Sequence, residues 1–387
     1  MTEKTARRPR VSRGWALPTA AAVALAGGIG YAGIADASSG LEPKSAQDIL
    51  TGMQQATMPP LAGTVVATAD LGLPELPGVG DSAELTSLVS GSHTMRVWYG
   101  GPDKMRLAKL GDASETNVIR NGEDAWIWSS TEKEAVHYNL ADAEHATDLS
   151  SAHPKPTAMP ETPQQASQLV LDSAEKYSTV STNSIARVAG RDVYELVLTP
   201  KSTNTLVKNV RLAVDGQTMI PLRVQVYSRK LSAPAYEIGY SSLSMGPVED
   251  RMFTFTAPSG TSVQEADTHE LTGEHSEHSG GAGHTKADAS PVQVSGQGWE
   301  SVYVMKAPAD LLEADAAPAS DRGPHGAADL DPAAIIASLP TTSGAWGSGR
   351  VLEGTLFSMI LTDDGRVAMG AVDSGALAAA LTKTPGQ

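Results

Sequence analysis

The chain has 387 residues, 41% of them hydrophobic and 19% charged, so it can bury a core and is long enough for two domains. It contains no cysteine, which excludes a disulfide framework, a thiolate metal site and a cysteine nucleophile. Its 44 acidic and 29 basic residues give a net charge of −15. This acidic excess argues against nucleic-acid binding, because phosphate recognition needs clustered lysine and arginine.

The first 37 residues have the pattern of an export signal. Basic residues are concentrated before position 14, and the stretch from Trp15 to Ala35 is uncharged and mostly small or apolar. Ala35 and Ala37 are the small residues that a signal peptidase reads. We therefore expect an exported, extracytoplasmic protein from which residues 1–37 are cleaved. The alternative is an N-terminal single-span membrane anchor, because about 20 apolar residues can cross a bilayer.

One helix and then a series of strands are predicted next. Apolar residues recur at helical spacing from Ser45 to Thr57, with Ser45 as the N-cap and Asp48 as its acidic partner. Leu61–Ala69 follows as a β-type run. Later runs alternate apolar and mixed residues, which is typical of strands with one buried face. The apolar positions of these runs are Met95, Val97, Tyr99, Val210, Leu212, Val214, Leu222, Val224 and Val226.

The turns between these runs favour an antiparallel meander. Asn121-Gly122 and Asp215-Gly216 supply the positive φ angles that tight hairpin turns need. One further helix is predicted over Pro163–Tyr177, with Thr162 as its cap. The fold class predicted for this part of the chain is therefore mainly β with some helix (α+β).

A segment rich in leucine, proline and glycine, Leu71–Gly91, interrupts the strands. Its composition predicts a long apolar loop. One interpretation is a loop that folds back on its own core. The other is a mobile lip at the mouth of a cavity, with Leu71, Leu73 and Leu76 as its candidate residues.

Tryptophan is concentrated in neighbouring hairpins. Trp98, Trp126 and Trp128 lie in adjacent predicted strands, and Trp126 and Trp128 share one strand face. These side chains either fill the core or line an apolar pocket. The sequence leaves both readings open.

Six segments form a pattern along the chain, namely Ile49–Met53, Leu61–Val66, Lys104–Leu107, Thr116–Trp128, Val136–Tyr138 and Met252–Val263. In this order they resemble the LolA/RseB-like superfamily, which includes the outer-membrane lipoprotein carrier protein LolA family. The last segment, Met252–Val263, is similar to the Phe-x-Phe-x-x-Pro-x-Gly-x-x-Val ending of LolA. The resemblance covers about residues 42–264. It departs from the carrier in the Leu71–Gly91 insertion and in the chain that follows residue 264.

The resemblance implies an unclosed, curved antiparallel β-barrel with a helical lid and an apolar cavity for lipid or lipoprotein acyl chains. It implies no cofactor and no metal. The strand patterns add the cavity candidates, although the inward face is not fixed by sequence. These candidates are Leu61, Val65, Met95, Val97, Trp98, Trp126, Trp128, Leu196, Leu198, Val224 and Val226.

The rest of the chain predicts a linker and a second domain. Residues 265–290 are acidic and rich in histidine and glycine, and they are too poor in large apolar residues to fold. The four histidines have no rigid metal-binding spacing, and a plain linker is favoured over weak metal binding. Residues 291–380 predict a small α/β domain, with strands over Gly298–Met305, Val351–Leu361 and Arg366–Val372 and a helix over Ser374–Leu381. In it, Trp346 either closes the small core or contacts a partner.

Two functions follow from this organisation. The first is an exported, non-catalytic protein that binds lipid or lipoprotein acyl chains as a carrier or chaperone. The alternative is an RseB-like sensor that contacts a membrane anti-sigma factor through its C-terminal domain, an analogy of domain order. An enzyme is not expected, because no motif brings together a nucleophile, a base and an orienting group.

Overall fold

The computed structural model describes residues 41–73, 90–111, 113–140, 162–165, 167, 176–266, 292–307 and 336–384. The predicted export signal, Leu76 and most of the predicted linker and Pro163–Tyr177 helix lie outside these residues. The chain separates into two units, Met1–Ser38 and Ser39–Gln387, and everything described belongs to the second. Among the described residues, no helix has the length and apolar character needed to span a membrane.

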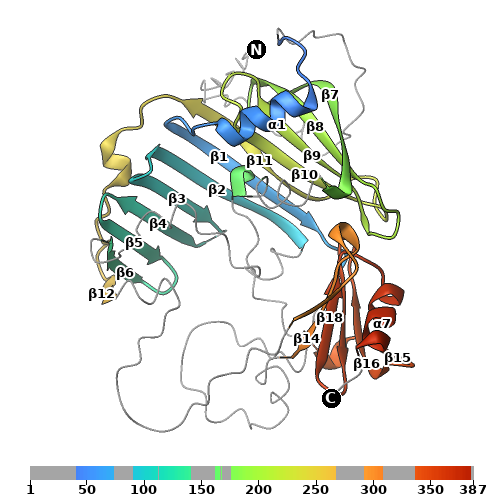
Figure 1. Cartoon of the computed structure of the whole chain (residues 1–387). Helices are drawn as coiled ribbons and strands as arrows, with labels where there is room; N and C mark the ends of the chain where they lie inside the picture. Colours follow the sequence, from blue (N-terminus) through green and yellow to red (C-terminus); the bar gives the residue numbers. More distant parts are fainter. Residues whose placement is uncertain are drawn as a thin grey trace, which may run out of the picture. The chain divides into compact units, whose positions relative to one another are not determined.

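A twelve-stranded curved sheet forms the larger part of the structure (Figure 1). Its order is β12-β6-β5-β4-β3-β2-β1-β11-β10-β9-β8-β7, so β12 and β7 are edges and the barrel is not closed. All pairs are antiparallel except β12 with β6. The strands are β1 (Leu61–Asp70), β2 (Ser90–Gly101), β3 (Lys104–Leu110), β4 (Glu115–Asn121), β5 (Asp124–Ser129), β6 (Glu134–Asn139), β7 (Ser178–Val188), β8 (Arg191–Pro200), β9 (Val207–Asp215), β10 (Pro221–Ser228), β11 (Pro234–Met245) and β12 (Ser262–Ala266).

Helix α1 (Ala46–Gln55) begins where the sequence predicts. The Ser45 hydroxyl accepts from the backbone N–H of Asp48 at 3.1 Å, and the Asp48 carboxylate accepts from the backbone N–H of Ser45 at 3.3 Å. This capping box satisfies two N–H groups that the first helical turn would otherwise leave unpaired. Ile49 and Leu50 are buried and join the main core.

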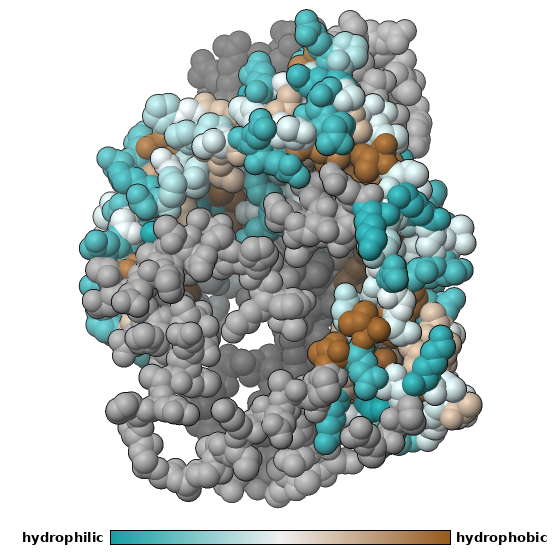
Figure 2. All heavy atoms as spheres, viewed as in Figure 1, coloured by the Kyte–Doolittle hydropathy of each residue, from teal (hydrophilic) through white to brown (hydrophobic). Residues whose placement is uncertain are grey.

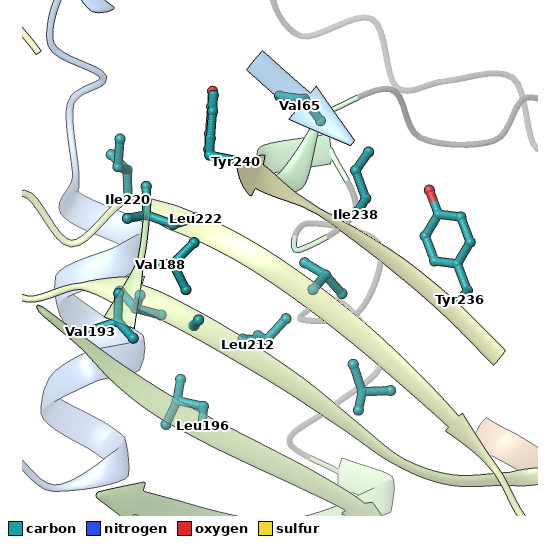
Figure 3. Close-up of a cluster of buried hydrophobic side chains, with 14 of the residues drawn as sticks. Val65, Val188, Val193, Leu196, Leu212, Ile220, Leu222, Tyr236, Ile238 and Tyr240 are labelled. Carbon is teal, nitrogen blue, oxygen red and sulfur yellow. The ribbon is translucent and has the colours of Figure 1, made fainter. Parts of the chain in front are cut away.

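The main core lies on the face of the sheet that α1 covers, which we call the α1 face. Figure 3 shows Val65, Ile238, Leu212 and Leu196 directed into one cluster beside α1. These side chains come from four strands, β1, β11, β9 and β8, and each is almost completely buried. The removal of these apolar side chains from water is the main stabilising contribution to the larger sheet, at about 25 cal/mol per Å² of apolar area.

A second, six-stranded sheet has the order β13-β14-β18-β17-β16-β15 and is antiparallel throughout. Helix α7 (Ser374–Lys383), capped by Asp373, packs Leu377 and Leu381 on one face. Trp346 is buried in this core, so it closes the core as one of the two readings expected. The strands are β13 (Gln293–Ser295), β14 (Val302–Lys306), β15 (Thr341–Gly344), β16 (Gly347–Glu353), β17 (Ser358–Thr362) and β18 (Arg366–Gly370).

Two strand predictions in this part were wrong in their bounds. The strand expected over Gly298–Met305 begins instead with a 3₁₀ turn, η4 (Gly298–Glu300), and β14 starts at Val302. The turn lets the Trp299 indole N–H donate to the Ser178 hydroxyl at 2.8 Å and pack against the main core. The run from Val351 to Leu361 is divided between β16 and β17.

The two sheets are joined by buried hydrogen bonds. The Ser228 hydroxyl donates to the carbonyl of Thr355 at 2.6 Å, and the Thr205 hydroxyl donates to the carbonyl of Ala371 at 2.7 Å. Thr355 in turn donates its backbone N–H to the carbonyl of Leu71, just after β1. The end of β1 is therefore held by the second sheet.

Candidate binding face

Cross-strand pairing shows which residues share a face of the larger sheet, because directly opposed residues point to the same side. Val65 is opposite both Met95 and Tyr240, and Val224 is opposite both Ile238 and Leu212. The same pairing and the core contacts place eight of the predicted cavity residues on the α1 face. These are Leu61, Val65, Met95, Val97, Leu196, Leu198, Val224 and Val226.

The three tryptophans of the prediction lie on the opposite face, which we call the back face. Trp98 is opposite Ala62, whose side chain points to the other side of the sheet from its neighbour Leu61. The Arg106 guanidinium lies 5.4 Å from the Trp98 ring centroid. Trp126 and Trp128 continue the same face on β5. Sequence reasoning therefore grouped side chains that the sheet separates.

The Phe-x-Phe segment explains the position of these tryptophans. Phe255 lies 5.0 Å from Trp126 and 6.5 Å from Trp128, between ring centroids. Phe253 belongs to the 3₁₀ turn η3 (Asp250–Phe253) and is 1% exposed, and Lys104 pairs with Asp250 at 2.7 Å. The segment that carries the strongest part of the family resemblance therefore covers the back face of β3–β6.

On the α1 face, the same strands carry a continuous line of aliphatic side chains, which we call the aliphatic row. Each member is directly opposite the next, one from each of five neighbouring strands. None of them is buried, and Val118 is 38% exposed. The aliphatic row consists of Val97, Leu107, Val118, Ile127 and Val136.

The lines of residues on either side of the aliphatic row differ in character. On one side, β3–β6 carry Lys109, Thr116, Ser129 and Glu134, which are polar. On the other side they carry Met105, Arg120, Ala125 and Tyr138, which are mixed. The face therefore has an apolar centre with a polar margin, which is the usual composition of a ligand site.

The predicted lip is described only at its beginning. Leu71 is buried, and Leu73 is half-buried near Gly354 of the second sheet. Leu76 lies outside the described residues. The lip stays a prediction, as does the cavity as a whole.

Burial determines the charge state of Tyr240, which lies on the α1 face opposite Val65. Burial raises the pKa of Tyr240 on the α1 face to about 12, against a smaller opposing effect from a hydrogen bond to Gln164. The Tyr240 phenol is therefore neutral at any physiological pH. Among the residues described, no group of histidine and carboxylate side chains could hold a metal ion.

The chain was compared with known proteins by sequence and by structure. No protein-family model matches the chain, and neither does any curated protein. The solved complex of Pseudomonas aeruginosa MucA/MucB matches 87% of this chain and 95% of that chain, at 16% identity and a TM-score of 0.38. A LolA superfamily protein from Nitrosomonas europaea matches 55% and 99%, at 14% identity and a TM-score of 0.22. A putative outer membrane lipoprotein-sorting protein domain from Vibrio parahaemolyticus matches 54% and 95%, at 12% identity and a TM-score of 0.23.

The unclosed sheet, the helix on its α1 face and the small second sheet are the architecture expected from the sequence resemblance. The chain has a LolA/RseB-like fold. The function is argued from the residues of this chain, because matches with identities and TM-scores this low carry no argument about it.

Within this LolA/RseB-like fold, the sequence prediction missed most of the aliphatic row. Only Val97 was among the predicted cavity residues. The signal was present, because Leu107, Val118, Ile127 and Val136 lie in runs that the family resemblance already marked as strands. The register of β4 and β5 was harder to predict, because the two-residue turn is Gly122-Glu123, one residue later than the predicted Asn121-Gly122. Counting outward from the predicted turn would have aligned Val118 with Ala125 instead of Ile127.

Proposed function

We propose that this exported protein binds the acyl chain of a lipid or lipoprotein on the aliphatic row, reversibly and without chemistry, as a carrier or chaperone. One observation supports the proposal. Over β8–β10 the side chains of the α1 face are buried in the main core that α1 joins, whereas over β3–β6 this face presents half-exposed aliphatic side chains in line. A continuous apolar surface of this kind marks a binding site more often than chance exposure.

The dimensions of the row suit an extended hydrocarbon chain. Five strands spaced about 4.8 Å apart give a row about 19 Å long. A bilayer core about 30 Å thick holds two acyl chains end to end, so one chain spans about 15 Å. Each methylene that leaves water contributes about 0.8 kcal/mol, so affinity should rise about fourfold per methylene until the row is filled.

The direct test is a charge placed in the middle of the row. Val118→Asp should abolish the uptake of a fluorescent fatty acid, because a carboxylate there cannot be desolvated against a hydrocarbon chain. Val263→Asp is the matched control, because Val263 on β12 is 49% exposed but lies outside the row. A series of unlabelled fatty acids of increasing length, measured by competition, tests the dependence on methylene number.

The proposal fails if both variants lose binding equally, or if affinity does not change with chain length. Native mass spectrometry of protein purified from its own host supplies an independent readout. A ligand-free spectrum, together with no uptake of fatty-acid probes, would contradict lipid binding altogether.

A second candidate function, an RseB-like sensor that contacts a membrane anti-sigma factor, is favoured by the second sheet. On the face opposite α7, Val294, Tyr303 and Met369 are exposed and directly opposed in turn, and in the view of Figure 2 hydrophobic residues gather on this sheet. Removing residues 291–387 discriminates the two functions. A carrier should keep its lipid affinity and transfer activity, whereas a regulator should lose a purified anti-sigma factor of its host in pull-down.

A further inference from the structure

A pocket that belongs to neither of these surfaces lies on the larger sheet. It has a volume of about 260 Å³ and is formed by β1, β10, β11 and the end of β7 with the turn that follows. Charged and apolar side chains both line it. The lining residues are Val66, Thr68, Arg187, Val188, Ala189, Arg223, Glu237, Gly239, Tyr240 and Ser241.

Arg223 is the unusual group in this pocket. Its side chain is half-buried, and within the part of the chain that the structure describes it makes neither a hydrogen bond nor an ion pair. A guanidinium carries five N–H donors, and leaving them unpaired while partly removed from water is costly. Most arginines of this sheet are paired, as Arg191 is with Asp215.

Gly239 leaves room for the aliphatic part of the Arg223 side chain, which we call the Arg223 stem. Gly239 is directly opposite Arg223 on β11, and a Cβ at Gly239 would lie 2.8 Å from Arg223 Cγ. A contact this short is not tolerated, so the stem can rest on the backbone only because residue 239 has no side chain. The first carbons of the Arg223 side chain therefore lie against the backbone of β11.

The neighbouring charges leave Arg223 as the available cation. The Glu237 carboxylate accepts a hydrogen bond from Gln225 Nε2 at 2.7 Å. Arg187 donates from Nε to Asp192 at 2.6 Å, and its terminal nitrogens are turned to no partner among the residues described. Arg187 and Arg223 therefore line the pocket together with the negative charge of Glu237, and Arg223 is the guanidinium of the two without a described carboxylate partner.

We propose that this pocket binds a small organic anion, whose carboxylate or phosphate oxygens pair with Arg223 and whose short apolar part lies against Val66 and Val188. Guanidinium groups bind both kinds of oxyanion through paired N–H donors. A pocket of this volume lies just below the usual range for ligand sites, about 300–1,000 Å³. The pocket is therefore a site for a small ligand, separate from the aliphatic row and independent of the function proposed for it.

The test uses the full exported chain and three probes, which are inorganic phosphate, hexanoate and hexyl phosphate, titrated by NMR of the amide-labelled protein. We expect saturable shifts of the Gly239 and Ser241 amides, weakened at least about tenfold in Arg223→Gln. Arg96→Gln, which removes an exposed arginine of β2, is the matched control and should bind like the wild type. The probe that binds most tightly identifies the oxyanion and shows whether the alkyl part contributes.

A second variant separates positioning from charge. Gly239→Ala keeps every charge but displaces the Arg223 stem, so it should weaken binding while thermal unfolding shows that the protein remains folded. The proposal is overturned if no probe gives saturable shifts at millimolar concentration, or if Arg96→Gln and Arg223→Gln lose affinity equally. The second result would indicate attraction by overall charge only.

Discussion

The two halves of the larger sheet carry similar strands but bury opposite faces. Over β8–β10 the α1 face is covered, and Leu212 is 0% exposed. Over β3–β5 the back face is the covered one, with Ile119 1% exposed, while Val118 next to it on the α1 face is 38% exposed. The side of the sheet that is sealed changes between the halves because two different segments cover them.

The covering segments explain this difference. Ile49 and Leu50 of α1 fill the α1 face of one half. Phe253 and Phe255, which follow β11, fill the back face of the other. The α1 face of β3–β6 thus remains apolar without a described cover, which is why it can serve as a binding face.

The largest expected effect comes from truncating equivalent positions in the two halves. Leu212→Ala should lower the free energy of unfolding by about 2–5 kcal/mol, because the residue is fully buried and a cavity remains. Val118→Ala should change it by less than about 0.5 kcal/mol, since the side chain is already in contact with solvent. Urea denaturation of both variants measures the difference. Similar losses would show that the α1 face is covered equally in both halves.

Much of this organisation could be predicted locally. The capping box at Ser45 and the alternation of Val210, Leu212 and Val214 each depend on a few neighbouring residues, and each appears in the structure as expected. The turn predicted at Asn121-Gly122 lies one residue later, because Asn121 still pairs with Asp124 and only Gly122 of the two has a positive φ. The fold class followed from their order and from the resemblance. These signals are short-range, so they survive without knowledge of the tertiary contacts.

The covered face could not be predicted in the same way. The sequence shows that Trp126 and Trp128 share one face of their strand, but it does not show which face is covered. The residue that covers it, Phe255, lies far along the chain. The parallel pairing of β12 with β6 is equally long-range. The tryptophans were therefore assigned to the cavity together with Val65 and Met95, although they lie across the sheet from them.

An intermediate effect is expected from loosening the α1 cover itself. Ser45→Ala removes the hydroxyl that accepts from the Asp48 N–H, and loss of such a cap costs about 1 kcal/mol. Ser244→Ala, an exposed serine of β11, is the control and should be nearly neutral. Denaturation measures both, and an unchanged stability in Ser45→Ala would show that packing alone holds α1.

The smallest expected effect is a pH dependence where β6 pairs with the edge strand β12. His137 stacks on Trp126 at 4.3 Å, and its two ring nitrogens contact Glu265 at 2.7 Å and Asp124 at 2.9 Å. Burial acts to lower the pKa of His137, but its hydrogen bonds to the Glu265 and Asp124 carboxylates and their negative charges outweigh it, so the pKa is raised above the ordinary 6.5. The folded protein therefore binds the proton more tightly than the unfolded chain.

This raised pKa fixes the sign of the pH effect. The stabilisation is fully present below the unfolded pKa of about 6.5 and is lost as the pH rises through the folded pKa. Because both carboxylates are mostly exposed, it should stay below about 1 kcal/mol. The difference in unfolding free energy between wild type and His137→Gln, measured across this range, should shrink as the pH rises. Glu265→Gln should reduce the same dependence, because the contact that joins β12 to β6 through His137 is then weakened, and a flat difference in both would place the proton elsewhere.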